Sequence, residues 1–335
     1  MHASLYASLP EEIASRLGLE KAYRGRQIFE GLHKRGQDFA SMTELPAALR
    51  EKLTAEVPLF TSSLSDTLRD EDGTIKLRIR LADGASVECV LLEADTGRKT
   101  ACLSTQAGCA MGCAFCKTGA LGFRRNLEAS EILEQFYHLA RGRGTINNIV
   151  FMGMGEPLEN LEALRKSLAV FTHPLGPALS PRRMTVSTCG SAPGIISLAD
   201  EGPAVGIAVS LVSADEEKRK ALMPAARRWG LAELKEALLY HQEKTGKRLT
   251  LEIVLLKGIN DGADDILRLR EYARGLDVIV NIIPWNPVEG LDFQEPSEAA
   301  VQLYYSRLER SGIPAVRRYR RGRKIGGACG QLGEV

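Results

Sequence analysis

The chain has 335 residues, of which 44% are hydrophobic and 26% charged, and its formal net charge is +2. This length and hydrophobic share are enough to bury a full core and two or three domains, which excludes a peptide module or a disordered tail. The small net charge does not by itself indicate nucleic-acid binding. No basic and apolar leader is visible, and no run approaches the roughly 18 apolar residues of a membrane span, so we expect a cytoplasmic protein without a membrane segment.

Residues 1–65 are expected to form a small helical domain. Helical spacing occurs over 9–17, 25–32 and 41–50, and Ser41 is placed to cap the third helix. Residues 75–81 then alternate apolar and basic side chains, turn at Asp83-Gly84 and resume at 87–93. This pattern predicts a β-hairpin, and we expect residues 66–94 to link the helical domain to the rest of the chain.

From about Thr100 the pattern changes to short apolar runs that alternate with longer segments of helical period. The expected strands are 100–105, 148–152, 184–188, 206–211, 249–256 and 278–284. Such alternation predicts α/β architecture with parallel strands and crossover helices. Because six units are too few for a complete eight-stranded barrel, we expect a partial (β/α)6 barrel over residues 95–311, with ligands at the carboxyl ends of its strands.

Cys109, Cys113 and Cys116 follow the first expected strand with the spacing C-x3-C-x2-C. Three thiolates can hold a four-iron cluster and leave one iron without a protein ligand, whereas an electron-transfer cluster takes four cysteines. A small chelating cofactor would complete that iron. A structural zinc site with Cys102 as the fourth ligand is the alternative interpretation. The remaining Cys89 and Cys189 are interpreted as ordinary strand residues.

Polar residues also follow the later strands. Gly153-Met-Gly-Glu-Pro157 comes directly after the second strand, where Glu156 offers a carboxylate to a cationic amine and the glycines permit close backbone approach. Ser187, Ser210 and Asn286 follow the third, fourth and sixth strands and can bond a ribose or a carboxylate.

The C-terminal segment 312–335 is expected to carry both a basic run and a reactive cysteine. Residues 317–324 hold six basic residues around Tyr319, which suits phosphate contacts with stacking, although a solvated strand end is an alternative interpretation. Cys329 follows in a glycine-rich stretch. Nearby positive charge favours the thiolate form, so Cys329 is predicted to be a nucleophile.

Together these motifs resemble the RlmN/Cfr family of dual-specificity radical S-adenosylmethionine (SAM) RNA methyltransferases. The resemblance covers about residues 20–333 and rests on five motifs, which are 102–116, 122–127, 151–157, 283–287 and 328–332. It implies a [4Fe-4S] cluster on Cys109, Cys113 and Cys116, with SAM as the chelating cofactor. The SAM contacts it implies are Gly155, Glu156, Ser187, Ser210, Leu211, Val212 and Asn286.

The reaction implied by the resemblance is methylation of an adenosine of 23S rRNA at C2, with a tRNA adenosine as a second substrate. Cys329 would carry the methyl group as S-methylcysteine, two SAM molecules would be used per turnover, and Cys102 would release the product through a transient disulfide. Glu88 falls where the family places a proton acceptor. The resemblance also implies a flavodoxin or ferredoxin as electron donor, a monomeric enzyme, and RNA contacts from the N-terminal domain and the basic run.

The sequence departs from the family pattern at Val212, where histidine is usual, at Pro224-Ala-Ala226, and at Gly326-Gly327. Three alternatives stay open at this point. They are C8 methylation of the same adenosine, as in Cfr, a radical SAM enzyme acting on another RNA or a small molecule, and a noncatalytic metal-containing RNA-binding protein.

Overall fold

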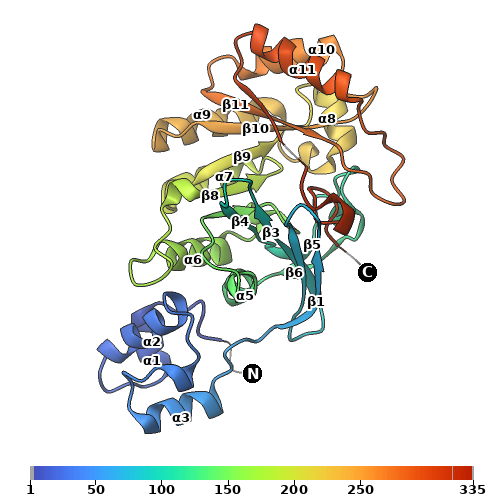
Figure 1. The fold of residues 1–335 in the computed structure, drawn as a ribbon. Coiled ribbons are helices and arrows are strands. Elements are labelled where there is room, and N and C mark those ends of the chain that lie inside the picture. Colours follow the sequence, from blue (N-terminus) through green and yellow to red (C-terminus); the bar gives the residue numbers. More distant parts are fainter. Residues whose placement is uncertain (1–3, 319, 334–335) are drawn as a thin grey trace.

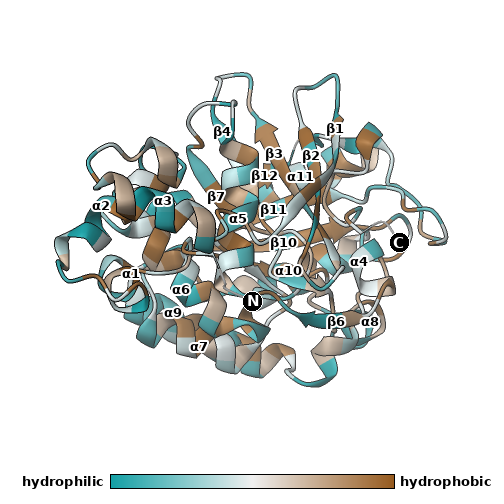
Figure 2. Ribbon diagram, turned by 90° about the horizontal axis from the view of Figure 1, so that it is seen from below, coloured by the Kyte–Doolittle hydropathy of each residue, from teal (hydrophilic) through white to brown (hydrophobic). Residues whose placement is uncertain are grey.

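A computed structural model describes residues 4–318 and 320–333. Its centre is a ten-stranded sheet with the order β1-β2-β3-β4-β7-β8-β9-β10-β11-β12 (Figure 1). The central strands are mostly hydrophobic, whereas the peripheral loops are mostly hydrophilic (Figure 2). In the part of the chain that the structure describes, no helix is both long enough and apolar enough to cross a membrane.

The expected α/β core is confirmed. The parallel strands are β4 (Lys99–Cys102), β7 (Asn148–Phe151), β8 (Met184–Thr188), β9 (Gly206–Ser210), β10 (Leu249–Leu255) and β11 (Val278–Pro284), followed by the unpredicted β12 (Ala315–Arg317). The helices of this region are the short α4 (Lys117–Ala120), then α5 (Ala129–Ala140), α6 (Leu161–Thr172), α7 (Ala192–Glu201), α8 (Glu216–Leu222), α9 (Leu231–Thr245), α10 (Ala263–Ala273) and α11 (Glu298–Arg310).

Alternation along the strands separates the hydrophobic core from the site. In β10, Leu249, Leu251, Ile253 and Leu255 are buried in the hydrophobic core, whereas Glu252 and Val254 line a cavity on the opposite face. In β8, Met184 and Val186 are buried in the same core and Ser187 lines the cavity. The period of two therefore gives the sheet one apolar face and one face that carries chemistry.

The predicted hairpin forms, but it is more than a linker. It consists of β2 (Ile75–Arg80) and β3 (Ser86–Glu93), and β3 also pairs antiparallel with β4 of the main sheet. An additional strand, β1 (Ser63–Arg69), pairs with β2 and crosses the expected boundary at residue 65. The segment 66–94 is therefore an antiparallel extension of the main sheet, and the domain boundaries themselves stay a prediction.

The N-terminal segment is helical as expected, with α1 (Pro10–Arg16), α2 (Tyr23–His33), a 3₁₀ turn η1 (Phe39–Ser41) and α3 (Ala47–Glu56). The third helix does not begin at Ser41. Asp38 instead caps the 3₁₀ turn by accepting a hydrogen bond from the Ser41 backbone. Pro46 disfavours helical conformation at the residue before it, so the helix begins only at Ala47.

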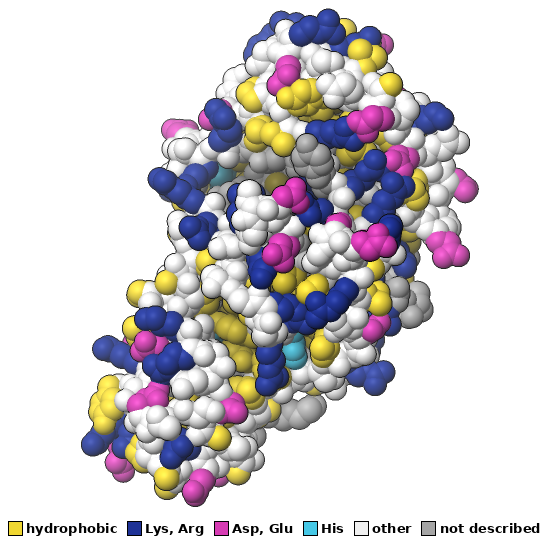
Figure 3. Space-filling view, in the orientation of Figure 1, with side chains coloured by type: hydrophobic (Ala, Val, Ile, Leu, Met, Phe, Trp, Pro, Cys, Tyr) yellow, Lys and Arg dark blue, Asp and Glu magenta, His cyan; other side chains and the backbone are white. Residues whose placement is uncertain are grey.

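An aromatic cluster attaches the N-terminal helices to α5. Tyr6 stacks on Tyr137 with ring centroids 4.4 Å apart, and His33 Nδ1 lies 2.5 Å from the Tyr137 hydroxyl. Burial lowers the pKa of His33 to about 3, so its imidazole is neutral at physiological pH. Figure 3 shows apolar side chains in the recess between the N-terminal lobe and the rest of the molecule, bordered by Lys and Arg side chains.

A buried carboxylate fixes the chain that leaves this lobe. Glu134 of α5 is fully buried and accepts hydrogen bonds from the backbone N–H groups and the hydroxyls of Thr61 and Ser62. The carboxylate is thus the acceptor for four donors of a segment that has no regular structure of its own. This interaction sets where the N-terminal lobe sits.

We expect Glu134→Ala to detach this segment and to lower the free energy of unfolding by about 3 kcal/mol, because hydrogen bonds to a charged group contribute about 1.5–3 kcal/mol each and are not additive. Limited chymotryptic digestion should show faster cleavage after Phe60, with exposed Glu243→Ala of α9 as the matched control. Equal cleavage rates in the two variants would contradict this role.

Candidate active site

One cavity at the carboxyl ends of the parallel strands brings together most of the predicted site residues. Nine of them line it, namely Cys109, Cys113, Cys116, Gly155, Glu156, Ser187, Ser210, Asn286 and Cys329. They come from segments that lie up to 220 residues apart in sequence. The shared topology of parallel strands accounts for this convergence, since all strand ends meet at one edge.

The cysteine loop runs between β5 (Gln106–Gly108) and α4 (Lys117–Ala120). Strand β5 pairs with β6 (Phe123–Asn126) in a small sheet that the sequence did not predict. Cys109 N donates to Gly122 O at 2.9 Å, which closes the loop onto this sheet. Gly108 has φ +76°, and a Cβ there would lie 1.9 Å from Gly122 O, so only glycine fits.

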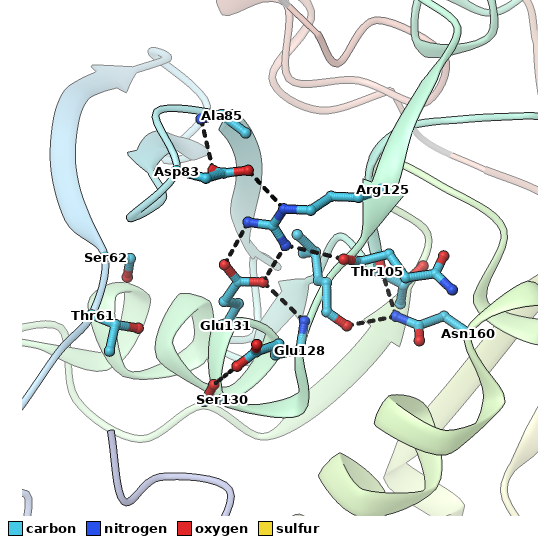
Figure 4. Close-up of polar contacts among 12 residues, drawn as sticks. Thr61, Ser62, Asp83, Ala85, Thr105, Arg125, Glu128, Ser130, Glu131 and Asn160 are labelled. Atoms are coloured by element: carbon cyan, nitrogen blue, oxygen red, sulfur yellow. Dashed lines mark hydrogen bonds and ion pairs between the residues drawn. The ribbon is translucent and has the colours of Figure 1, made fainter. Parts of the chain in front are cut away.

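Arg125 of β6 holds this small sheet in place. Its guanidinium binds both carboxylate oxygens of Glu131 on α5, at 2.7 and 2.8 Å, and Asp83 of the hairpin turn at 2.8 Å (Figure 4). The hydrogen bond from Arg125 lowers the pKa of Asp83 to about 2. The site loop is therefore anchored to both the hairpin and α5 by one cation.

The three thiols of the loop are suited to binding iron. They are soft donors on one cavity wall, and burial raises the pKa of Cys109 to about 12 and that of Cys116 above its ordinary value. Iron has to displace these protons on binding. Among the described residues no three Cys, His, Asp or Glu side chains converge on a position for a single ion, and the cluster ligands stay a prediction supported by their common cavity.

Glu156 presents a buried carboxylate to the same cavity. Its Oε1 accepts from Leu158 N at 3.1 Å and its Oε2 from Cys189 N at 2.7 Å, which fixes its orientation. Burial raises the pKa of Glu156. A cationic amine placed beside this carboxylate would favour its ionised form.

The neighbouring Gly155 has φ +99°, and a Cβ there would lie 2.5 Å from the Gln106 side chain. A glycine is therefore required beside Glu156. Asn286, on the other side of the cavity, donates from Nδ2 to Cys329 O at 3.0 Å, while its buried Oδ1 has no partner within the described chain. A buried acceptor of this kind fits a ligand that brings its own hydrogen-bond donor.

Two charged residues of the cavity, Glu252 and Arg318, were not predicted as SAM or catalytic residues. Glu252 of β10 accepts from Ser187 Oγ at 3.1 Å and lies 3.3 Å from Arg318 Nη1. The only sequence signal for Glu252 was a lone carboxylate inside an apolar strand. Arg318 was predicted to be part of an RNA-binding run, but it lines the cavity instead.

The rest of the basic run is also engaged within the chain. Arg320 and Arg323 pair with Glu295, Arg321 pairs with Asp95, and Lys324 pairs with Glu71. Arg317 pairs with Glu298. Tyr319, the predicted stacking residue, lies outside the described residues. The run is therefore not a free basic stripe, although exposed pairs of this kind are weak enough for phosphates to compete for them.

Cys329 lies between two cavities. It lines the cavity of the cluster cysteines and also a smaller one that it shares with Cys102, Arg318 and Met152. All seven cysteines are free thiols. The negative charge that the Cys329 thiolate would carry raises the pKa of Arg318, and burial raises the pKa of Cys102 to about 12.

Hydrogen bonds tie the Cys329 segment to the cysteine loop. Lys117 N donates to Gly330 O at 2.8 Å, and Thr118 Oγ1 donates to Leu332 O at 2.6 Å. Gly333 N donates to Glu88 Oε2 at 2.7 Å. Glu88 itself is buried, is paired with Lys76 at 3.1 Å and does not line the cavity, so its visible role is to hold the tail against β3.

Leu211 and Val212 are also placed away from the cavity lining. Val212 N donates to Glu252 O at 3.1 Å, and Val212 O accepts from Asn260 Nδ2 at 2.8 Å. Both backbone hydrogen-bonding groups of Val212 thus already have partners within the chain. Val212 has φ +61°, which is unusual and strained for a β-branched residue.

Comparisons with known proteins agree with this geometry. A model of the radical SAM superfamily matches residues 103–270, and a model of the ribosomal RNA large subunit methyltransferase N-terminal domain matches residues 11–58. The crystal structure of a radical SAM methyltransferase from Sphaerobacter thermophilus superposes with a TM-score of 0.94 at 39% identity, covering 98% of this chain and 99% of that one.

Relatives named probable dual-specificity RNA methyltransferase RlmN include one from Treponema pallidum (strain Nichols), 48% identical over 99% of this chain and 98% of its own length. Another, from Thermus thermophilus, is 43% identical over 97% of this chain and 91% of its own length.

The fold and the three-cysteine loop, with these matches, define a radical SAM enzyme, a class that holds a [4Fe-4S] cluster and uses SAM. Within that class the chain belongs to the RlmN family of dual-specificity radical SAM RNA methyltransferases. The resemblance and the cofactors expected from the sequence are confirmed, and the noncatalytic alternative is set aside.

The burial of Cys102 makes its reactivity strongly dependent on pH. Its pKa is raised from 9.0 to about 12, so near pH 8 the folded protein should hold about a thousandfold less Cys102 thiolate than the denatured chain. We expect iodoacetamide to alkylate Cys102 correspondingly more slowly in the folded, iron-free protein, with a tenfold rise per pH unit up to pH 11.

Peptide mass spectrometry after timed quenching would measure this rate, with half-buried Cys329 as the internal control. The same raised pKa also makes the stability of the folded protein depend on pH. The folded state holds the Cys102 proton more tightly, so the contribution of this group to stability is lost as the pH rises from about 9 towards 12. Equal alkylation of Cys102 in folded and denatured protein would refute its burial.

Proposed function

We propose that this enzyme methylates C2 of an adenosine in 23S rRNA through an S-methylcysteine at Cys329 and uses two SAM molecules per turnover. A tRNA adenosine is the proposed second substrate. The observation that carries the proposal is that Cys329 lines both the cavity of the cluster cysteines and the cavity of Cys102. The names of the relatives, dual-specificity RNA methyltransferases, support the substrate class.

The aromatic C2–H of adenine is neither acidic nor strongly nucleophilic, so direct methyl transfer from SAM to that carbon is unfavourable. When bound, the [4Fe-4S] cluster and SAM supply a carbon-centred radical. In the proposed scheme the cluster is held by Cys109, Cys113 and Cys116. Glu156 orients the methionyl ammonium of SAM, and Ser187, Ser210 and Asn286, which line the same cavity, bind its other polar groups.

Cys329 acts first as a nucleophile in this scheme. Its thiolate takes the methyl group of one SAM, and S-adenosylhomocysteine leaves. The guanidinium of Arg318, which lines both cavities with Cys329, places a positive charge near this sulfur. The S-methyl group then loses a hydrogen atom to the radical derived from the second SAM, and its carbon bonds to C2 of adenine.

Cys102 completes the turnover. The adduct on C2 carries an unpaired electron, which the oxidised cluster would accept as the C2 proton leaves. The Cys102 thiolate would then bond to the sulfur of Cys329, and the carbon released from that sulfur would take up a proton to become the methyl group, which frees the RNA and leaves a disulfide for a dithiol reductant to open. The shared cavity brings the two thiols into one place. The proton from C2 needs an acceptor, for which Glu88 is the proposal from family resemblance. Glu88 is also paired with Lys76 and accepts a hydrogen bond from Gly333 N, so its alternative role is to position the C-terminal tail.

The remaining partners also belong to this proposal. An electron from a flavodoxin or ferredoxin is needed for the second SAM, and we propose a monomeric enzyme acting in the cytoplasm. The target base has to be unstacked to reach an enclosed cavity. The recess beside the N-terminal lobe, with its border of Lys and Arg side chains, is the proposed entrance for the RNA (Figure 3).

Anaerobically reconstituted enzyme, given SAM, reductant and an unmodified 23S rRNA fragment, should form 2-methyladenosine. Nucleoside mass spectrometry would detect the product, and Cys329→Ala should abolish it because the methyl carrier is lost. Cys89→Ala, a buried cysteine that lines neither cavity, is the matched control and should retain activity. Formation of 8-methyladenosine would show methylation at C8 in place of the proposed C2. If neither methylated adenosine formed, the proposed substrate would be overturned.

The Cys102→Ala variant should separate attachment of the RNA to Cys329 from release of the methylated product. Without the resolving thiol, the RNA should remain covalently bound to Cys329, and denaturing gel electrophoresis should show a protein–RNA adduct that survives heating in detergent. The double variant Cys102→Ala, Cys329→Ala should form none. Full turnover by Cys102→Ala would rule out the proposed role of Cys102.

A further inference from the structure

Cys189 lines the same cavity as Cys329 and the three proposed cluster ligands. It follows β8, and its Sγ lies 3.8 Å from Sγ of Cys113. Nothing in the local sequence distinguishes it from an ordinary strand residue. In the structure it is the sulfur in contact with a proposed cluster ligand.

The backbone of Cys189 is held on both sides. Its N–H donates to Glu156 Oε2 at 2.7 Å, and its carbonyl accepts from Arg219 Nη2 at 2.6 Å. Arg219 is itself buried with 1% of its surface exposed. Gly190 follows with φ +103°, and a Cβ there would meet Arg219 and Leu234 at 3.0 Å. These contacts fix the backbone at Cys189, which holds its thiol beside the Cys113 sulfur.

The chemistry of the pair decides which sulfur donates. A cysteine that ligates iron is a thiolate and has no hydrogen to give. Cys113 in that state can only accept, so the S–H of Cys189 has to be the donor. The competing acceptor nearby is the Glu156 carboxylate, which already accepts hydrogen bonds from Leu158 N and Cys189 N and which faces the SAM ammonium in the proposed function.

We propose that Cys189 is a positioning residue that donates an S–H···S hydrogen bond to Cys113 and thereby raises the reduction potential of the cluster. Hydrogen bonds to ligating sulfurs stabilise the more negative, reduced state of an iron–sulfur cluster. The inference rests on the proposed cluster site at Cys109, Cys113 and Cys116. It makes electron entry, on which cleavage of SAM depends, partly a property of a residue outside the three-cysteine motif.

The test compares wild-type protein with Cys189→Ala, Cys189→Val and Cys189→Ser after anaerobic reconstitution with iron and sulfide. Iron and sulfide contents should be equal, and a potentiometric titration followed by electron paramagnetic resonance should give a lower potential for the alanine and valine variants. The serine variant should stay near wild type because its hydroxyl still donates. Valine matches the size of cysteine, so a lower potential in that variant is not explained by a void.

Resonance Raman spectra in H2O and D2O provide a second readout. The iron–sulfur stretching bands of wild type and Cys189→Ser should shift on deuteration more than those of Cys189→Val. Equal potentials and equal isotope shifts in all four proteins with intact clusters would overturn the inference while leaving the proposed function standing. A wild-type protein that assembles no iron–sulfide cluster would instead refute the proposed function.

Discussion

The site depends on how the C-terminal tail is held against the cysteine loop. Two hydrogen bonds make this connection, from Lys117 N to Gly330 O and from Thr118 Oγ1 to Leu332 O, and they join segments more than 200 residues apart in sequence. Two more hold the tail to other parts of the molecule, from Asn286 Nδ2 to Cys329 O and from Gly333 N to Glu88 on β3. Without them the sulfur of Cys329 would have no fixed relation to the cavity, because the glycine-rich tail has little regular structure of its own.

The rest of the architecture serves this placement. Parallel strands deliver Glu156, Ser187 and Asn286 to one edge, and the ion pairs of Arg125 fix the small sheet that carries the cysteine loop. Inside the cavity the buried carboxylate of Glu252 is paired with Arg318, which limits the cost of removing that carboxylate from water. A radical reaction benefits from such a site, since its groups are positioned before the substrate enters.

Local patterns in the sequence were sufficient for much of this account. Alternating apolar and basic residues predicted the hairpin, and short apolar runs between segments of helical period predicted the six parallel strands. Cysteine spacing and polar or glycine-rich strand ends, with the family resemblance, indicated nine residues that line one cavity. Contacts between residues far apart in the sequence could not be predicted from such local patterns. Glu295, Asp95 and Glu71 neutralise much of a run that reads as free basic charge, and Arg318 turns inward from that run. Neither the contact of Cys189 with Cys113 nor the pairing of Glu88 with Lys76 leaves a signature in local sequence.

The central claim is that Cys329 carries the methyl group from which the radical takes hydrogen. Turnover with SAM deuterated in its methyl group tests it most directly, with mass spectrometry of the 5′-deoxyadenosine that is released. The account predicts deuterium in 5′-deoxyadenosine over several turnovers, and its loss in Cys329→Ala. Product RNA carrying a fully deuterated methyl group, together with unlabelled 5′-deoxyadenosine, would contradict it.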